Sequence, residues 1–210
     1  MRPIKPQPEP ASFYEQVQKK GEEFLVQHPN LKGSKLKPYW RACIPELREA
    51  YSHICAYTCH WICPDTGAAT VDHFKPKELY PQDAYRWSNY RLVCSLLNSR
   101  KGVNEEILDP FTIQDGWFTL HFPSLQLKPG EVLTQEEAYK VERTIRILKL
   151  NDMTCINGRK SWLIPYLKGA PLSFMEEKAP FLAEELKRQK LLDLGHPIWQ
   201  TFHKISSPGA

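Results

Sequence analysis

The chain has 210 residues, of which 41% are hydrophobic and 25% charged, and its 28 basic against 24 acidic side chains give a net charge of +4. This composition is typical of a globular protein. A chain of this length can bury a hydrophobic core, and we expect either one domain or one domain with an appended helical part. The mild positive charge permits a polyanionic partner without demanding one. The longest apolar stretches are too short to span a bilayer, and the first ten residues lack the apolar centre of a secretory signal, so we expect a cytoplasmic protein.

The N-terminal region predicts an extended arm followed by helices. Residues 1–11 are rich in proline, which favours an extended conformation. Ser12 and Glu15 have the spacing of a capping box, so a helix is expected to start there and to end before Pro29. A second, short helix is expected to begin near Pro45.

The middle of the chain predicts irregular structure followed by a strand and a helix. Residues 55–71 contain the turn signal Pro-Asp-Thr-Gly and no clear periodicity. The run Arg91–Cys94 reads as a strand. Ser95 can cap a following helix that carries Asn98 and Lys101.

The C-terminal half predicts one strand and two helices. A strand is expected at 117–122. Thr134 and Glu137 have capping-box spacing, and the apolar residues of 138–148 recur three or four apart, as in a helix. A last helix is expected at 180–195, where a proline marks the start and a glycine the end.

The candidate catalytic and metal-binding residues are Asp72, His73 and Asn98. Two strands followed by a helix would bring the three together, and neighbours on an extended segment point to opposite sides. One of the pair could then face a metal ion and the other an attacking water. Mg²⁺ accepts few protein oxygens and keeps its waters, so one carboxylate and one carboxamide suffice, while a neutral imidazole can take a proton from water. Asn89 is better suited to hold the loop between the strands through bonds to its backbone.

These residues stand in a longer pattern that resembles the HNH endonuclease family, in the version whose third member is asparagine. The matching text is Asp-His-Phe-Lys-Pro-Lys at 72–77, Tyr-Arg-Trp-Ser-Asn-Tyr-Arg-Leu-Val-Cys at 85–94 and Asn-Ser-Arg-Lys-Gly at 98–102. It is similar to the HNH proteins of bacterial anti-phage systems, including the nuclease subunit of Septu and of related retron modules. The likeness continues at 107–110 and 144–159 and covers about residues 40 to 165.

The resemblance implies an α+β fold with a ββα-metal core that hydrolyses phosphodiester bonds of nucleic acid, DNA favoured, with Mg²⁺ or Mn²⁺. In the matching positions His73 is the general base, Asp72 and Asn98 bind the ion, and Asn89 supports the catalytic histidine. The expected parts of the chain are an N-terminal arm with helices at 1–50, the HNH core at 51–104, and a mainly helical region packed on it at 105–210. A regulatory ATPase subunit is the expected protein partner.

The family often carries a zinc site made of two Cys-x-x-Cys pairs, and this chain departs from that spacing. The candidate ligands are Cys55, Cys59, Cys63 and Cys94. Tetrahedral zinc needs four such ligands, and His60 could replace one of them. Leu97 stands where a further cysteine is expected, which indicates that the knuckle has become apolar packing.

The basic residues near the motif have two readings. They are Lys75, Lys77, Arg100 and Lys101. Crowded near an ion, they would contact backbone phosphates; otherwise they are ordinary solvated charges. Asn98 could likewise cap its helix instead of binding metal. At the level of function, the alternatives are an RNase acting on tRNA or mRNA, a catalytically silent module that binds nucleic acid or a partner, and a structural zinc protein.

Overall fold

The computed structural model describes residues 1–200, which form two compact units. The N-terminal unit comprises residues 4–57 and 61–112, and the C-terminal unit comprises residues 1–3, 58–60 and the chain from 113 onward. Residues 4–50 therefore share a unit with most of the predicted 51–104 core. The last ten residues of the predicted 105–210 region lie outside the described part.

The first helix of the N-terminal unit is α1 (Lys19–Gln27), which continues a π-helical turn at Tyr14–Gln18 and ends before Pro29 as expected. The predicted Ser12–Glu15 capping box is wrong. Ser12 Oγ instead donates to Glu46 Oε1 at 3.1 Å, and the first turn has no side-chain cap. The Ser12 hydroxyl thus binds a residue distant in sequence and not the first turn of its own helix.

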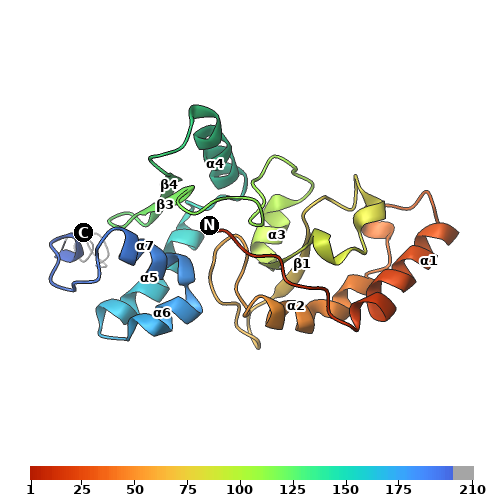
Figure 1. The fold of residues 1–210 in the computed structure, drawn as a ribbon, viewed down its shortest axis with the longest axis horizontal. Coiled ribbons are helices and arrows are strands. Elements are labelled where there is room, and N and C mark those ends of the chain that lie inside the picture. The colour runs from red at the N-terminus through yellow and green to blue at the C-terminus, as the bar shows by residue number, and fades with distance from the viewer. Residues whose placement is uncertain (201–210) are drawn as a thin grey trace. The chain divides into compact units, whose positions relative to one another are not determined.

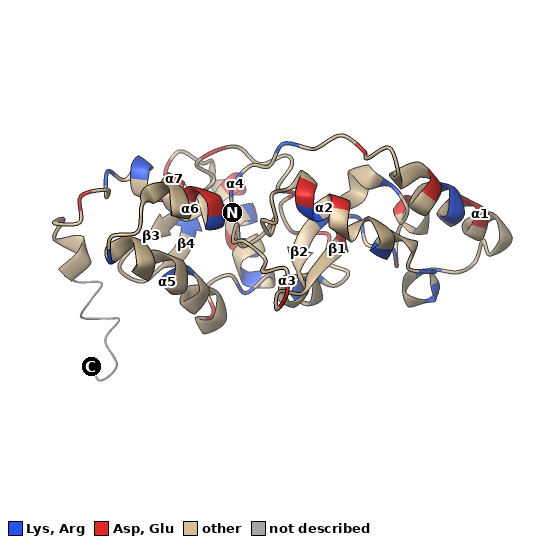
Figure 2. Ribbon diagram, turned by 90° about the horizontal axis from the view of Figure 1, so that it is seen from below, with Lys and Arg blue, Asp and Glu red and all other residues tan. Residues whose placement is uncertain are grey.

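The second helix, α2 (Ile44–Ala50), has Pro45 in its first turn, as predicted. Short 3₁₀ turns occur at Gly33–Lys35, Tyr39–Cys43, Pro81–Asp83 and Trp87–Asn89. Both helices carry residues of both signs (Figure 2): two lysines precede two glutamates in α1, and Arg48 lies between Glu46 and Glu49 in α2.

An aromatic cluster forms the core of this unit beside the helices. The Phe13 ring meets the rings of Trp87 and Tyr90 edge-on at centroid distances of 5.4 and 5.6 Å. Gly21 of α1 lies against Tyr85, where a Cβ atom would come within 2.1 Å of the ring. Only glycine lets the helix approach this closely.

Strands β1 (Ala69–His73) and β2 (Tyr90–Cys94) pair antiparallel, with Asp72 opposite Arg91 and His73 opposite Tyr90. Helix α3 (Ser95–Lys101) follows β2 directly and packs against both strands (Figure 1). The expected strand and the helix after it are confirmed. The cap differs, because Cys94 is the N-cap residue and Ser95 is the first residue of the helix.

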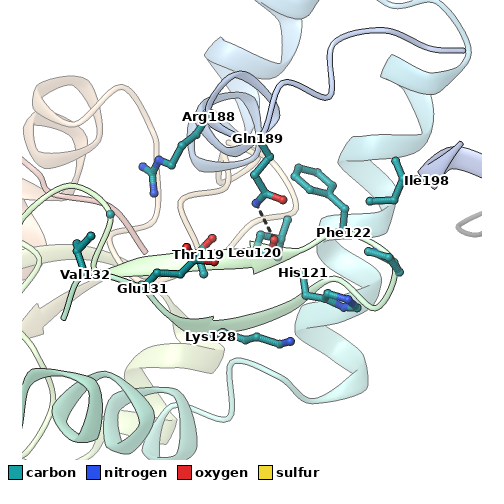
Figure 3. Close-up of a pocket in the computed structure, with 13 residues that line it drawn as sticks. Thr119, Leu120, His121, Phe122, Lys128, Glu131, Val132, Arg188, Gln189 and Ile198 are labelled. Carbon is teal, nitrogen blue, oxygen red and sulfur yellow. Dashed lines mark hydrogen bonds between the residues drawn. The ribbon is translucent and has the colours of Figure 1, made fainter. Parts of the chain in front are cut away.

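The C-terminal unit contains a second antiparallel pair, β3 (Phe118–His121) and β4 (Gln126–Pro129). On each strand, one residue has its outward backbone groups bonded to side chains. On β3, Glu185 Oε2 accepts from the Leu120 N–H at 2.8 Å. Gln189 Nε2 donates to the Leu120 carbonyl, also at 2.8 Å (Figure 3). On β4, Asn151 bonds the N–H and carbonyl of Leu127 at 2.7 and 2.9 Å. The hairpin therefore does not offer these groups for pairing with another strand.

The helices of this unit are α4 (Gln135–Ile147), α5 (Met153–Leu167), α6 (Leu172–Lys178) and α7 (Pro180–Arg188). The capping box at the start of α4 is confirmed. The predicted end of the last helix at Gly195 is wrong, because the chain leaves the helix at Lys190, whose φ is 57°. The Leu191 N–H then bonds to the Leu186 carbonyl at 2.8 Å, as in a Schellman C-cap.

The α+β class is confirmed, since residues 1–200 combine helices with two small antiparallel sheets, one in each unit. Within residues 1–200, no helix combines the length and apolar character needed to cross a membrane.

Candidate functional site

His73, the last residue of β1, is held in a single orientation. Its side chain is 7% exposed, and its Nε2 lies 2.9 Å from the Ala84 carbonyl. A carbonyl can only accept, so Nε2 carries the proton and Nδ1 keeps its lone pair. Burial lowers the pKa of His73 to about 4, against the opposing effect of the Ala84 bond. The imidazole is therefore neutral near pH 7 and has one nitrogen able to take a proton.

Two aromatic rings fix the plane of this imidazole. Trp40 and Tyr90 meet the His73 ring edge-on at centroid distances of 4.7 and 5.2 Å. The Tyr90 hydroxyl also donates to the Ala84 carbonyl at 2.8 Å, so that oxygen is held by two donors. Rotation of His73 would break both the packing and the hydrogen bond.

Asp72 is buried beside His73 and has a partner at each oxygen. Oδ2 accepts from the Tyr57 hydroxyl at 2.6 Å, and Oδ1 lies 2.9 Å from Lys101 Nζ. Burial raises the pKa of Asp72, while the Lys101 ammonium and the Tyr57 bond act in the opposite direction. Burial and the nearby Asp72 carboxylate together raise the pKa of Tyr57. Tyr57 thus remains a hydrogen-bond donor to Asp72.

Lys101 is fully buried, which corrects its expected role as a phosphate contact. Its ammonium pairs with Asp72 and also donates to the His73 carbonyl at 2.7 Å. Helix α3 turns Leu97 and Lys101 to the same side, because residues four apart share a face, and both are buried. Lys101 belongs to the interior of the site, and the burial of Leu97 agrees with its reading as apolar packing.

Asn98 lies in the middle of α3 and does not cap it, since Cys94 is the N-cap. Its Nδ2 donates to Thr70 Oγ1 at 3.0 Å and to the Val71 carbonyl at 3.2 Å. Both bonds use the nitrogen, so they orient the side chain and leave the Oδ1 lone pairs for another partner.

Asp72, His73 and Asn98 border one cavity of about 140 Å³, together with Trp40 and Glu78. A water molecule takes up about 30 Å³ of liquid, so this space holds a small number of waters. A larger cavity of about 570 Å³ in the C-terminal unit is bordered by the β3–β4 hairpin and α7 (Figure 3). Its lining also includes an imidazole, a carboxylate and a carboxamide, from His121, Glu131 and Gln189. The Gln189 amide is bonded to the Leu120 carbonyl, and the exposed His121 ring lies 2.8 Å from the Ser124 hydroxyl, whereas Asp72, His73 and Asn98 come from β1 and α3, which pack together.

Asn89 ties together the loop between β1 and β2. Its Oδ1 accepts from the Lys75 N–H at 2.8 Å, and its Nδ2 donates to the carbonyls of Lys75 and Asp83, both at 3.1 Å. The Phe74 N–H bonds to the Asn89 carbonyl at 2.9 Å. These bonds fix the chain directly after His73 and position the loop that carries Ala84.

The remaining basic side chains are nearer the surface. Lys75 is exposed and pairs with Asp83 at 3.2 Å. Lys77 is half-buried, borders the cavity and pairs with Glu78 at 3.0 Å. Arg100 is half-buried on α3.

The cysteines do not assemble as a four-ligand zinc site. Cys55 and Cys94 have their sulfurs 3.9 Å apart, whereas the Cys63 thiol donates to the Asp65 carboxylate. Cys59 and His60 belong to the C-terminal unit. Across residues 1–200, which include all six cysteines, there is no disulfide and no group of three or more His, Cys, Asp or Glu side chains that could hold a metal ion. Two thiols fall short of what tetrahedral zinc requires.

Tyr57 and the pair of Arg91 with Asp109 were not anticipated from the sequence. Arg91 binds Asp109 through two bonds of 2.8 and 2.6 Å and stacks on Phe111, with its guanidinium carbon 3.4 Å from the ring centroid. Asp109 lies in the Ile-Leu-Asp-Pro stretch that belongs to the family resemblance, which is the signal that could have identified it. No comparable signal marks Tyr57.

Comparison with known proteins indicates a distant relationship. No protein-family model matches the chain. It is similar to the Septu protein PtuB of Bacillus thuringiensis, with 24% identity over 144 residues. The matched region is 69% of this chain and 52% of that protein, so the chain spans about half the length of the curated relative.

Proposed function

We propose that residues 51–104, most of which lie in the N-terminal unit, are the ββα-metal core of an HNH endonuclease that hydrolyses phosphodiester bonds in DNA, as the effector of a Septu-type anti-phage defence system. The observation that carries this proposal is the meeting of His73, Asp72 and Asn98 at one cavity. The similarity to the Septu protein PtuB supports the assignment to defence.

His73 is the general base of the proposed reaction. Its Nε2–H is bonded to Ala84, so Nδ1 takes the proton from the attacking water. The Ala84 carbonyl then stabilises the imidazolium that forms. A phosphate anion entering the cavity raises the pKa of the imidazole from about 4, because an opposite charge favours the protonated form. The base therefore becomes stronger when substrate is bound.

Asp72 and Asn98 are the residues that would hold Mg²⁺ or Mn²⁺. A carboxylate and a carboxamide oxygen at one small polar cavity are donors of the type these ions accept, with waters completing the shell. When bound, the ion supplies positive charge for the phosphate and the leaving oxygen. One feature does not fit, namely the Lys101 ammonium that already neutralises Asp72.

Lys75, Lys77 and Arg100 are the remaining candidates for contacts with the nucleic-acid backbone. Lys75 and Lys77 follow His73 in the chain, and each is paired with an acidic side chain of its own loop. Phosphates would compete with those carboxylates for the ammonium groups, so the contribution to affinity should decrease as salt is added.

A catalytically silent nucleic-acid-binding module is the second candidate, and the pairing of both Asp72 oxygens favours it. Incubation of the full chain with supercoiled plasmid and with RNA, with Mg²⁺, Mn²⁺ or EDTA, separates the two. Metal-dependent cutting of either polymer establishes the nuclease and identifies its substrate. Binding of nucleic acid without cutting under every metal condition favours the silent module.

A partner protein is also part of the proposal, because an unregulated nuclease would harm its host. We propose a regulatory ATPase subunit. Affinity purification from the native host tests this, and recovery of the chain without any ATPase would argue against it.

A further inference from the structure

Lys101 occupies the position of a cation inside the candidate site. Its ammonium lies 2.9 Å from Asp72 Oδ1 and 2.7 Å from the His73 carbonyl oxygen, and its side chain is fully buried. A buried ammonium needs a compensating anion, and Asp72 supplies that charge. Lys101 therefore links the side chain of Asp72 to the backbone of His73.

A divalent ion and the ammonium would compete for the same carboxylate. Asp72 has the Tyr57 hydroxyl on Oδ2 and the ammonium on Oδ1, so an ion binding there meets a positive charge within a few ångströms. Repulsion between cations at such distances is large in a buried site, where water screens it little. The long, flexible lysine stem allows the ammonium to move away.

We propose that Lys101 is a resident cation that competes with divalent metal for Asp72, so that metal binding requires displacement of its side chain. Lys101 is thus a positioning residue that also limits metal affinity. The inference rests on the proposed function only in taking Asp72 as a metal ligand. The Asp72–Lys101 pair itself is independent of any activity.

Mn²⁺ binding to the full chain, followed by electron paramagnetic resonance without nucleic acid, tests the competition. Lys101→Met removes the ammonium and should tighten Mn²⁺ binding by about tenfold or more, because the repulsion is gone. Lys101→Arg keeps the charge and should bind Mn²⁺ as weakly as the unchanged protein. Asp72→Asn combined with Lys101→Met should abolish the gain. Equal or weaker binding by Lys101→Met would overturn the inference.

Thermal unfolding with and without Mn²⁺ keeps the test decisive if Lys101→Met folds poorly. That variant leaves a buried carboxylate without a counterion, so added Mn²⁺ should raise its melting temperature more than that of the unchanged protein. The double variant, with neither charge, should show no such response. Failure of Mn²⁺ to stabilise or restore Lys101→Met would overturn the inference.

Failure of the proposed function would look different. If Lys101→Met gains Mn²⁺ affinity while the unchanged protein cuts neither DNA nor RNA with metal, the nuclease assignment fails and the competition stands. If the unchanged protein cuts nucleic acid with metal and Lys101→Met gains no Mn²⁺ affinity, the nuclease assignment stands and the competition between Lys101 and metal is rejected.

Discussion

Asp72 lies opposite Arg91 in the β1–β2 pair, yet Arg91 forms its two-bond ion pair with Asp109. Two buried cations thus have separate carboxylates, Asp109 for Arg91 and Asp72 for Lys101. The Lys101–Asp72 pair holds the end of β1, where Asp72 and His73 lie. The Arg91–Asp109 pair connects β2 to the segment that follows α3.

Loss of the Asp109 carboxylate should destabilise the protein strongly. Asp109→Ala leaves the Arg91 guanidinium, whose side chain is 4% exposed, without its anion. Breaking one side of a buried pair costs about 3 to 5 kcal/mol. Urea unfolding measures this cost. The control is Asp115→Ala, whose ion pair with Arg188 is 75% exposed at the aspartate and should contribute less than about 1 kcal/mol. Similar effects of the two substitutions would contradict the structural role of the buried pair.

Replacement of Asn89 should loosen the loop that orients His73. Asn89→Ala removes three hydrogen bonds and leaves the Lys75 N–H without this acceptor. The expected loss is about 2 to 3 kcal/mol of unfolding free energy, together with reduced cutting. Asn104→Ala is the matched control, because Asn104 is exposed and makes one long bond to the Lys101 carbonyl. Equal stability of the two variants would speak against the role assigned to Asn89.

Burial of neutral His73 should make stability depend on pH. Its folded pKa of about 4 lies below the unfolded value of 6.5, so the unfolded chain binds the extra proton first as pH falls. The stability contribution is complete above pH 6.5 and is lost as pH falls toward 4, by about 3 kcal/mol in total. Urea unfolding at pH 7 and pH 4.5 should show a smaller pH-dependent loss for His73→Gln than for the unchanged protein. An identical loss in both would mean that His73 is not buried as a neutral ring.

Several elements followed from local sequence alone. The capping box of Thr134 and Glu137, the first turn of α2 with Pro45, and the strand at 91–94 each depend on residues that are neighbours in the chain. In these places the local preference and the tertiary packing agree.

Other features depended on partners far away in sequence. Ser12 has capping-box spacing but binds Glu46, 34 residues away. Lys101 looked like a surface cation, and only the packing of α3 on β1 reveals that it is buried against Asp72. Helix α5 has no simple apolar stripe and contains Pro165, so periodicity did not mark it. Patterns within a short stretch of sequence do not indicate which distant residue a side chain will contact.

Chelation of metal should silence the proposed reaction reversibly. EDTA should abolish cutting of plasmid or RNA, and Mg²⁺ or Mn²⁺ should restore it, because charge on the phosphate needs a cation. Zn²⁺ content of the purified protein, measured by mass spectrometry, should be far below one ion per chain, since the cysteines do not form a four-ligand site. Cutting that persists in excess EDTA would contradict the metal-dependent reading.

The most direct measurement is the cutting rate of His73→Ala with Mg²⁺ and Mn²⁺, compared with the unchanged protein and with His121→Ala. His121 is an exposed histidine of the C-terminal unit and serves as the matched control. Loss of a general base should lower the rate by about 10² to 10⁴-fold in His73→Ala, with circular dichroism unchanged and His121→Ala unaffected. A folded His73→Ala protein that cuts nucleic acid at the unchanged rate would contradict the assignment of His73 as the base.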